Sequence, residues 1–465
     1  MNILVLNGSP KGRHSITLQT VLFLEKKFSG HNFEVLHVGQ SIKALERDFS
    51  KAREMLEKAD MILFSYPVYT FIAPCQLHKF IELMKKSGVD FSGKFATQIT
   101  TSKHFYDVTA HRYVQDNSQD MDMKYIRGLS ADMDDLLTQK GQKEAETFFD
   151  YVLDCVENDI YEPVPVKLPE GRRIPVTMPK PESISRGGDV VIVTDCEEGN
   201  TQLENMIARF REKLPYNTRV VNLNDFQFKG GCLGCFNCAT TGKCVYKDGF
   251  DDFLRNTIQC AQSIIYAFTI KDHSMGPLFK MYDDRQFCNG HRTVTMGMPV
   301  GYLVSGDYSR EFNLQMVLEG RSQVGGNFLA GIATDETDPD RAIDNLAHSL
   351  DFALKTRHTQ PSNFLGVGGM KIFRDLIFVM QGLMREDHKF YKAHGQYDFP
   401  QKQMGRLVFM YLVGSMMKSK KLQEKMGKIN MNEGMLMPYQ KAIGVEMELM
   451  SSIKAEAEKK KKNKK

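Results

Sequence analysis

Four cysteines lie within 13 residues near the middle of the chain, at Cys232, Cys235, Cys238 and Cys244. Four soft thiolates at this spacing can converge on one tetrahedral zinc ion or on one cubane centre. Structural zinc sites more often use two well-separated pairs of ligands, whereas a compact triad with a fourth cysteine is typical of ferredoxin-type ligation. The spacing therefore favours a [4Fe–4S] cluster, with zinc or unmetallated thiols as the alternatives.

The loop between the first apolar segment and the first predicted helix carries hydroxyl groups and a base. Leu18, Val21 and Leu22 recur at helical spacing behind it, so the loop ends where a helix begins. Open N–H groups at a helix N-terminus favour an anion, and polar side chains of the loop can complete a phosphate site. These side chains are Ser9, Lys11, Ser15 and Thr17.

Two later loops follow the predicted strands at residues 61–64 and 95–99. The first is a stiff aromatic segment beside which a flat ring can lie, and the second offers hydroxyls and main-chain amides. Ligands of doubly wound sheets bind beyond the carboxyl ends of the strands, so all three loops are expected to hold one cofactor. His104 and Tyr106 come next and are candidate proton donors in substrate reduction. The loop residues are Pro67, Val68, Tyr69 and Thr70, then Thr100, Thr101 and Ser102.

Residues 1 to about 150 resemble the flavodoxin-like NAD(P)H-dependent FMN reductases. Ile16 stands where that family usually has an asparagine, which removes one polar contact. The resemblance implies that the first loop binds the FMN phosphate, that the two later loops frame the isoalloxazine, and that NAD(P)H is a transient electron donor. The residues that carry it are Gly8, Ser9, Pro10, Lys11, Ser15 and Thr17, followed by Pro67, Val68 and Tyr69.

Strands alternate with helices twice along the chain, from residue 1 and again from residue 189. This order predicts an α/β fold of two tandem flavodoxin-like domains, each a doubly wound parallel sheet, plus a C-terminal α-helical region. A proline-rich linker separates the domains, and the helical region is rich in methionine. The expected boundaries are 1–162 for the FMN-binding domain, 163–188 for the linker, 189–357 for the domain with the four cysteines, 358–458 for the helical region and 459–465 for a lysine-rich disordered tail.

The second domain resembles the iron–sulfur flavoproteins, which implies that its four cysteines hold the cluster. Its counterpart of the phosphate loop contains Asp195, Glu197 and Glu198 and no base, so a second FMN is disfavoured. The residues that carry the resemblance are Gly199, Asn200 and Thr201, the four cysteines, Lys247 with Asp248, and Asp251 with Asp252.

A polar segment follows the third predicted strand of the second domain, at a position where sheets of this type bind ligands. Histidine, cysteine and aspartate together can bind metal or move protons, but loop and domain-interface contacts are the favoured interpretation. The residues concerned are His273, Lys280, Asp284, Arg285, Cys288 and His291.

These features together predict an NAD(P)H-dependent FMN oxidoreductase of iron–sulfur flavoprotein type. Electrons would pass from the nicotinamide through FMN and the cluster to a small molecule or to a protein acceptor such as a ferredoxin-like protein. One alternative is a plain FMN-dependent reductase of quinones, nitro compounds or enones with a structural cysteine site. Another is a non-catalytic electron-transfer or redox-sensing module.

The charge and hydropathy of the chain limit its partners. The net charge is +4, and six lysines among the last seven residues account for the excess, so no nucleic-acid partner is expected. The first residues lack the pattern of a signal peptide, and no apolar run reaches the roughly 20 residues of a membrane span. We therefore expect a cytoplasmic protein, and the sequence leaves a homodimer open.

Overall fold

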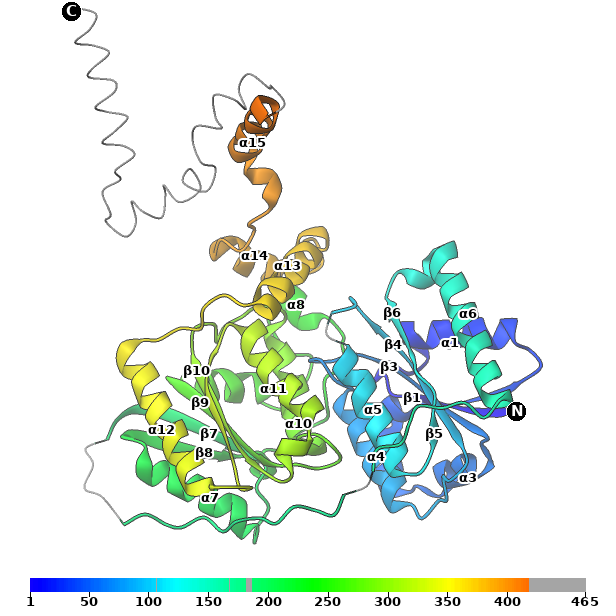
Figure 1. Cartoon of the computed structure of the whole chain (residues 1–465), viewed down its shortest axis with the longest axis horizontal. Helices are drawn as coiled ribbons and strands as arrows, with labels where there is room; N and C mark the ends of the chain where they lie inside the picture. Colours follow the sequence, from blue (N-terminus) through cyan, green and yellow to red (C-terminus); the bar gives the residue numbers. More distant parts are fainter. Residues whose placement is uncertain (106, 167, 181–185, 418–465) are drawn as a thin grey trace, which may run out of the picture. The chain divides into compact units, whose positions relative to one another are not determined.

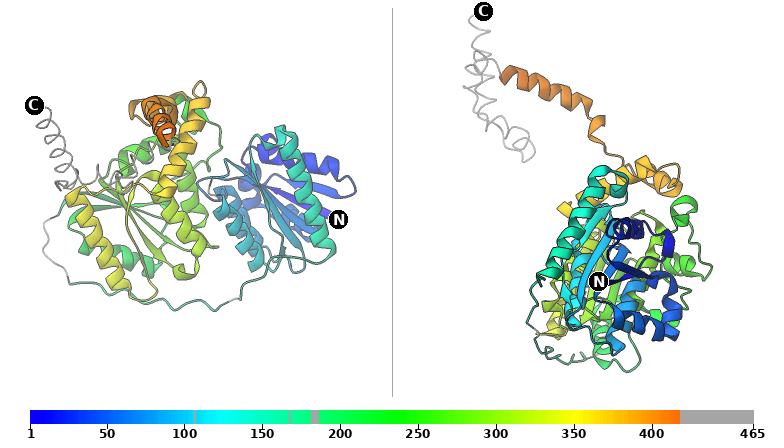
Figure 2. Two further views of the ribbon diagram at one scale, coloured as in Figure 1. Left: turned by 45° about the horizontal axis from the view of Figure 1, so that its top comes forward. Right: turned by 90° about the vertical axis from the view of Figure 1, so that its right-hand side faces the viewer.

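The computed structural model describes residues 1–105, 107–166, 168–180 and 186–417. The chain divides into two compact units, residues 1–394 and residues 395–465. The first unit contains two parallel β-sheets with helices packed on both faces of each (Figures 1 and 2). The prediction of an α/β fold with two parallel sheets is confirmed.

The first sheet and its helices occupy residues 2–157. Strands β1 and β3 are buried almost throughout, as expected for central strands of a parallel sheet covered on both sides. The elements are β1 (Asn2–Asn7), η1 (Gly12–His14), α1 (Ile16–Lys27), β2 (Asn32–Leu36), α2 (Val38–Arg47), α3 (Ser50–Lys58), β3 (Met61–Pro67), α4 (Cys75–Lys86), β4 (Phe95–Ser102), α5 (Val108–Asp120), β5 (Lys124–Tyr125), β6 (Leu129–Asp132), η2 (Asp135–Leu137) and α6 (Gln139–Glu157).

The second sheet and its helices occupy residues 187–356. The cysteine segment lies between β8 and β9, in the part of this domain with the shortest helices. The elements are β7 (Gly187–Thr194), α7 (Thr201–Lys213), β8 (Tyr216–Asn222), η3 (Leu223–Asp225), α8 (Asn237–Thr241), α9 (Phe250–Phe253), η4 (Leu254–Ile258), β9 (Ser263–Thr269), α10 (Gly276–Arg285), η5 (Gln286–Asn289), β10 (Pro299–Ser305), η6 (Tyr308–Arg310), α11 (Phe312–Gly325), β11 (Phe328–Thr334) and α12 (Pro339–Thr356).

The two sheets have the same strand order. It is β2-β1-β3-β4-β5 in the first, where β6 also pairs with β4, and β8-β7-β9-β10-β11 in the second. Every pairing is parallel, with Leu4 opposite Ile62 in one sheet and Ile192 opposite Ile265 in the other. Ser15 caps α1 and Asn200 caps α7 at equivalent places. The duplication inferred from the sequence is therefore present in the topology and in the capping of the first helix.

Equivalent helices of the two domains pack against each other. Helix α4 contacts α10, and α5 contacts α11, as the ribbon also shows (Figure 1). Leu77 and Phe80 of α4 share one hydrophobic core with Phe279 and Tyr282 of α10. An interface in which each element packs against its own equivalent is called isologous. Here such an interface joins two domains of one chain.

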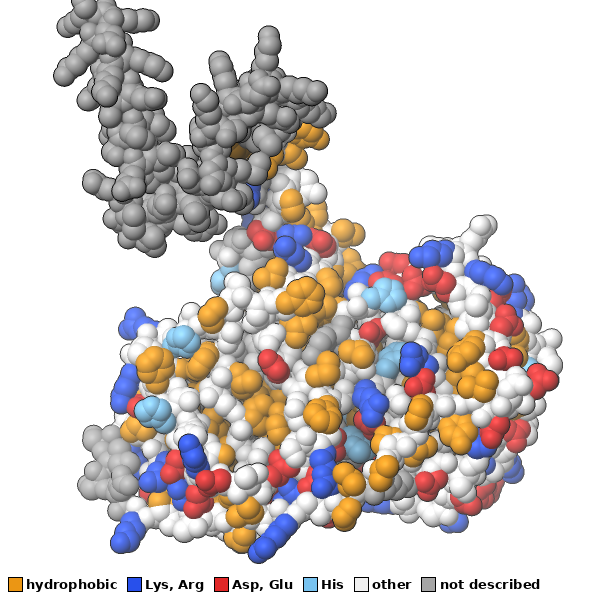
Figure 3. All heavy atoms as spheres, viewed as in Figure 1, with side chains coloured by type: hydrophobic (Ala, Val, Ile, Leu, Met, Phe, Trp, Pro, Cys, Tyr) orange, Lys and Arg blue, Asp and Glu red, His pale blue; other side chains and the backbone are white. Residues whose placement is uncertain are grey.

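Two further helices belong to the first unit. Helix α13 (Phe364–Val379) packs against α11, and α14 (Arg385–Ala393) packs against α8. In the second unit the described residues form η7 (Pro400–Lys402) and α15 (Met404–Met417), whereas residues 418–458 of the expected helical region and the tail at 459–465 lie outside the described part. No helix in the described residues is long and apolar enough to cross a membrane. Acidic and basic side chains are interspersed over the face shown in Figure 3.

Candidate functional site

A cavity of about 480 Å³ lies at the carboxyl end of the first sheet and is walled on its other side by the second domain. The three loops singled out in the sequence meet in it, although Thr17 of the first and Thr101 of the last are 84 residues apart in the chain. The predicted cofactor residues in its lining are Ser9, Lys11, Ser15, Thr17, Pro67, Val68, Tyr69, Thr70, Thr101 and Ser102. Thr100 is buried behind the lining and shares a 2.8 Å hydrogen bond with Nε2 of His111.

The first loop is shaped by the junction of β1 with α1. Ser15 begins the helix, and its hydroxyl accepts a 3.4 Å hydrogen bond from the backbone N–H of Leu18. Thr17, the second residue of α1, shares a 2.6 Å hydroxyl contact with Thr101 at the end of β4. Ser9, Ser15 and Thr17 are buried, yet they line the cavity. Buried hydroxyls beside the N-terminus of a helix are chemically suited to an anion.

The second loop is held in a strained turn by the other domain. Thr70 and Phe71 have positive φ angles of 47° and 71°, and Tyr69 and Ile72 exchange backbone hydrogen bonds across the turn. Lys280 of α10 donates to the carbonyl of Tyr69 at 3.1 Å and to the hydroxyl of Thr70 at 2.7 Å. Positive φ in residues with side chains costs free energy, so these contacts are needed to keep the turn.

The second domain supplies the opposite wall of the cavity. Arg285 holds the cysteine segment there, since it donates to the carbonyl of Gly230 at 2.8 Å and to both carboxylate oxygens of Asp248. Burial would raise the pKa of Asp248, but the hydrogen bonds from Arg285 outweigh it and bring that pKa to about 2. Phe236 of the same segment lies 5.6 Å from the ammonium group of Lys11 in the phosphate loop.

The four clustered cysteines, Cys232, Cys235, Cys238 and Cys244, all line this cavity. Among the described residues, no group of three or more His, Cys, Asp and Glu side chains is arranged to hold a metal ion. Burial raises the pKa of Cys232 to about 12 and that of Cys238 to about 11, whereas Cys235 is exposed. The expected ligation of a cluster by Cys232, Cys235, Cys238 and Cys244 is therefore not supported.

Replacing Cys235 by serine tests whether the cysteine segment holds a metal centre. We expect no change in the iron, sulfide or zinc content of anaerobically purified protein, and a change in the free energy of unfolding within about 0.5 kcal/mol, because the side chain is exposed. Stoichiometric iron and sulfide in the unaltered protein, lost in the variant, would restore the cluster.

Of the two predicted proton donors, only His104 lies within the described residues. His104 does not line the cavity: its side chain is half exposed, shares a 3.2 Å hydrogen bond with the hydroxyl of Ser130, and lies 3.4 Å from the carboxylate of Asp135. Its φ of 51° turns the chain at this point. Tyr106 lies outside the described residues.

The corresponding loop of the second domain lines a smaller cavity of about 280 Å³. Asp195, Glu197 and Glu198 face it, and Lys271 forms a 2.6 Å ion pair with Glu197. Burial raises the pKa of Asp195 to about 7, although the nearby Lys271 opposes the rise. Carboxylates here would repel a phosphate, as the sequence indicated.

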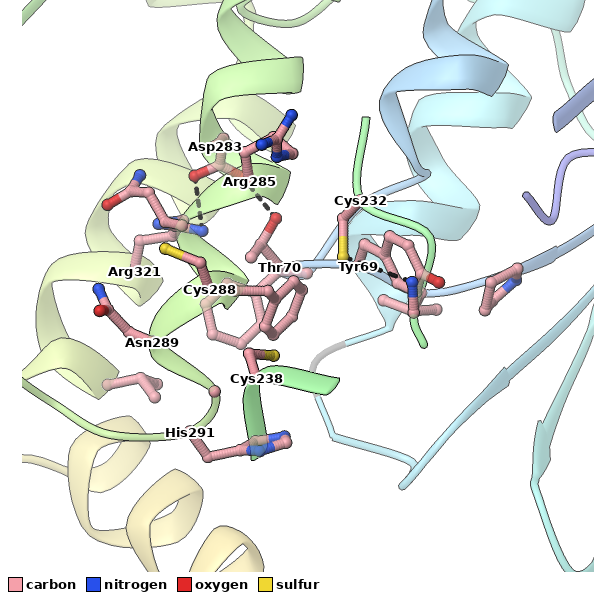
Figure 4. Close-up of a pocket in the computed structure, with 18 of the residues that line it drawn as sticks. Tyr69, Thr70, Cys232, Cys238, Asp283, Arg285, Cys288, Asn289, His291 and Arg321 are labelled. Atoms are coloured by element: carbon pink, nitrogen blue, oxygen red, sulfur yellow. Dashed lines mark hydrogen bonds and ion pairs between the residues drawn. The ribbon is translucent and has the colours of Figure 1, made fainter. Parts of the chain in front are cut away.

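Sequence reasoning missed the wall that the second domain contributes. Figure 4 shows Thr70 beside Asp283, with Cys288 and His291 on the same side of the pocket. The polar segment at 273–291 was the available signal. Several of its residues do bridge the domains, since His273 pairs with Asp120 at 3.0 Å and Asp284 accepts from the backbone of Cys75 at 2.8 Å.

Known proteins resemble part of this chain. The family model described as NADPH-dependent FMN reductase matches residues 1–131. No curated protein matches the chain in sequence. Similar solved structures include general stress protein 14 from Treponema denticola in complex with FMN (13% identity, 33% of this chain and 98% of that chain, TM-score 0.29) and a putative quinone reductase from Klebsiella pneumoniae (16% identity, 36% and 88%, TM-score 0.27).

These structural likenesses are too weak to carry an argument about function, because their TM-scores lie below 0.3. The family match is different in kind, since it covers all three loops that line the larger cavity. Residues 1–131 are similar to the NADPH-dependent FMN reductase family, and this similarity supports an NAD(P)H-dependent FMN oxidoreductase.

Proposed function

We propose that the chain binds one FMN in the cavity between its two domains and uses it to pass electrons from NAD(P)H to a small planar acceptor. The observation that carries this proposal is the meeting of the three loops of the first domain with a wall from the second domain. FMN, when bound, accepts a hydride from the nicotinamide and releases electrons to the acceptor. The two domains then form a single composite site.

The residues present fit FMN. The hydroxyls of Ser9, Ser15 and Thr17 and the N-terminus of α1 would hold its phosphate, and Lys11 would balance the charge. Tyr69 and Thr70, with Thr101 and Ser102 opposite, would frame the ring system. A volume of about 480 Å³ lies in the ordinary range of cofactor and ligand pockets, about 300 to 1,000 Å³.

The walls favour a planar, conjugated acceptor such as a quinone, nitro compound or enone. Phe71, Phe105, Phe287 and Phe373 line the cavity beyond the phosphate loop, and aromatic rings stack well on flat molecules. The proposed electron path runs through FMN alone, because the described residues contain no group of three or more His, Cys, Asp and Glu side chains arranged to hold a metal ion. A protein acceptor, a homodimer and a role for His104 and Tyr106 in protonation stay as predictions.

Replacing Ser15 by alanine tests the phosphate site. The loss of its helix cap is expected to lower the free energy of unfolding by about 1 kcal/mol, and FMN binding should weaken as well. Thr138→Ala is the matched control, because Thr138 caps α6 in the same way but lies outside the cavity. Urea unfolding and quenching of FMN fluorescence measure the two effects. If both variants bound FMN like the unaltered protein, Ser15 would have no part in the site.

Gly234 offers the test of a composite site. This residue of the second domain has a φ of 59°, and a methyl group added to it would overlap the hydroxyl of Tyr69. Gly234→Ala is therefore expected to weaken FMN binding at least about tenfold, which is about 1.4 kcal/mol. Gly249→Ala is the matched control: its φ of 80° is equally unfavourable for alanine, but nothing lies within 4 Å of the added atom.

The comparison between the two glycine variants isolates the contact with Tyr69. Both should lose about 1 kcal/mol of stability through the backbone, and only Gly234→Ala should lose FMN affinity and NAD(P)H oxidation with menadione as acceptor. Equal FMN affinity in the two variants would contradict a site shared between the domains.

A further inference from the structure

Six aromatic rings that line the cavity form a chain of five successive ring contacts. They come from the first domain, from the segment after α10, and from α13, so three separate parts of the first unit meet here. Neighbouring centroids are 5.2 to 6.3 Å apart. In order along this chain of contacts they are Tyr69, Phe287, His291, Phe373, Phe105 and Phe71. Phe71 follows Tyr69 by two residues in the sequence.

His291 is the only imidazole among the described residues that line the cavity. Its Nδ1 lies 3.2 Å from Oδ2 of Asp387, and its backbone N–H donates to the same oxygen at 3.2 Å. Asp387, on α14, is fully buried. Within the described part of the chain, Nε2 of His291 has no hydrogen-bond partner. One edge of the ring is thus fixed by a carboxylate, while the other is free to meet a molecule in the cavity.

Other groups of the cavity wall are poorly suited to give up a proton near neutral pH. Burial raises the pKa of the Tyr69 phenol well above its usual range, and the same cause raises the pKa of the Cys232 and Cys238 thiols. Asp283 is engaged by Lys280 and by Arg321, the latter at 2.7 Å. Histidine is the side chain whose ordinary pKa suits proton donation at this pH.

We propose that His291, oriented by Asp387, is the acid that protonates the acceptor. This rests on the proposed function, and it gives the second domain a chemical part in the reaction. Bound FMN would supply a hydride, which carries two electrons and one proton, to a quinone, and Nε2 of the His291 imidazolium would supply the second proton to the quinone oxygen. The product is the hydroquinone, and water returns the proton to the imidazole.

Anaerobic stopped-flow measurements of the holoenzyme separate the proton step from the rest. In His291→Asn, whose amide can still donate to Asp387, reduction of bound FMN by NADPH should be unchanged. Reoxidation by menadione, a quinone, should slow about a hundredfold or more. Reoxidation by ferricyanide, which takes single electrons and needs no proton, should stay within about twofold. His348→Gln, an exposed histidine of α12, is the control for the substitution itself.

A second measurement does not depend on turnover. In a proton–nitrogen spectrum of the apoprotein, the Nδ1–H of His291 should give a downfield, slowly exchanging signal that is lost in His291→Asn and in Asp387→Asn. Absence of this signal from the unaltered protein, or equal slowing with menadione and ferricyanide, would overturn the assignment. Failure of NADPH to reduce a bound FMN at all would instead overturn the proposed function.

Discussion

Replacing Lys280 by methionine is expected to lower the free energy of unfolding by about 3 to 5 kcal/mol. Lys280 is fully buried between the two domains, where it pairs with Asp284 and lies 3.2 Å from Asp283. Burial already raises the pKa of Asp284, and Lys280 opposes that rise. Without the ammonium group, a buried carboxylate is left without its partner. Urea unfolding at pH 7 measures the loss.

The same substitution should weaken FMN binding, because Lys280 also holds the turn at Tyr69 and Thr70. Lys355→Met is the matched control, since Lys355 also pairs with an aspartate four residues away on a helix, but its side chain is 64% exposed. Exposed pairs contribute about 1 kcal/mol or less. Equal losses in the two variants would mean that the network between the domains does not support the fold.

Asp195→Asn should make the protein more stable at pH 8 and leave it almost unchanged near pH 4. Burial raises the folded-state pKa of this carboxyl from 3.8 to about 7. Below pH 3.8 the Asp195 carboxyl is protonated in both the folded and the unfolded state, so it does not lower the free energy of unfolding there. Between about pH 4 and 7 the unfolded chain releases its proton while the folded chain keeps it, so stability falls as the pH rises. The asparagine variant avoids a cost of up to about 4 kcal/mol above pH 7.

Urea unfolding at pH 4.5, 6 and 8 measures this difference. Asp189→Asn is the control at the other end of β7, because hydrogen bonds from Arg219 lower the pKa of that carboxyl. Loss of the Asp189 carboxylate should leave the free energy of unfolding at pH 8 unchanged or slightly lower. A constant difference between Asp195→Asn and the unaltered protein at all three values would show that Asp195 is ionised in the folded state throughout.

The alternation of parallel strands with helices, and the loop that leads into α1, could be predicted from the sequence because both depend on local signals. Apolar runs and turns mark the strands, and the cap at Ser15 is encoded within a few residues of the helix it begins. Thr100 shows the limit of that reasoning. Successive side chains of a strand point to opposite faces, so Thr101 meets Thr17 beside the cavity while Thr100 turns to His111.

The rest of the site depends on contacts between distant parts of the chain. Phe236 lies beside Lys11, and Asp387 beside His291, and neither pairing leaves a signal in local sequence. The cysteine spacing predicted a cluster, which the described residues do not support, because they contain no group of three or more His, Cys, Asp and Glu side chains arranged to hold a metal ion. Spacing brings thiols near one another, but the path of the chain between β8 and β9 also depends on distant contacts, such as those of Arg285 with Gly230 and Asp248.

Hydrogen–deuterium exchange of the whole chain, with and without FMN, tests the composite site most directly. We predict one FMN per chain and slower exchange in the loops at 9–17, 67–71 and 101–103. Exchange should also slow in the second domain at 232–236 and 286–292, and it should not change at 195–200. Protection confined to the first domain, or protection at 195–200 with none at 232–236, would contradict a cofactor site built by both domains.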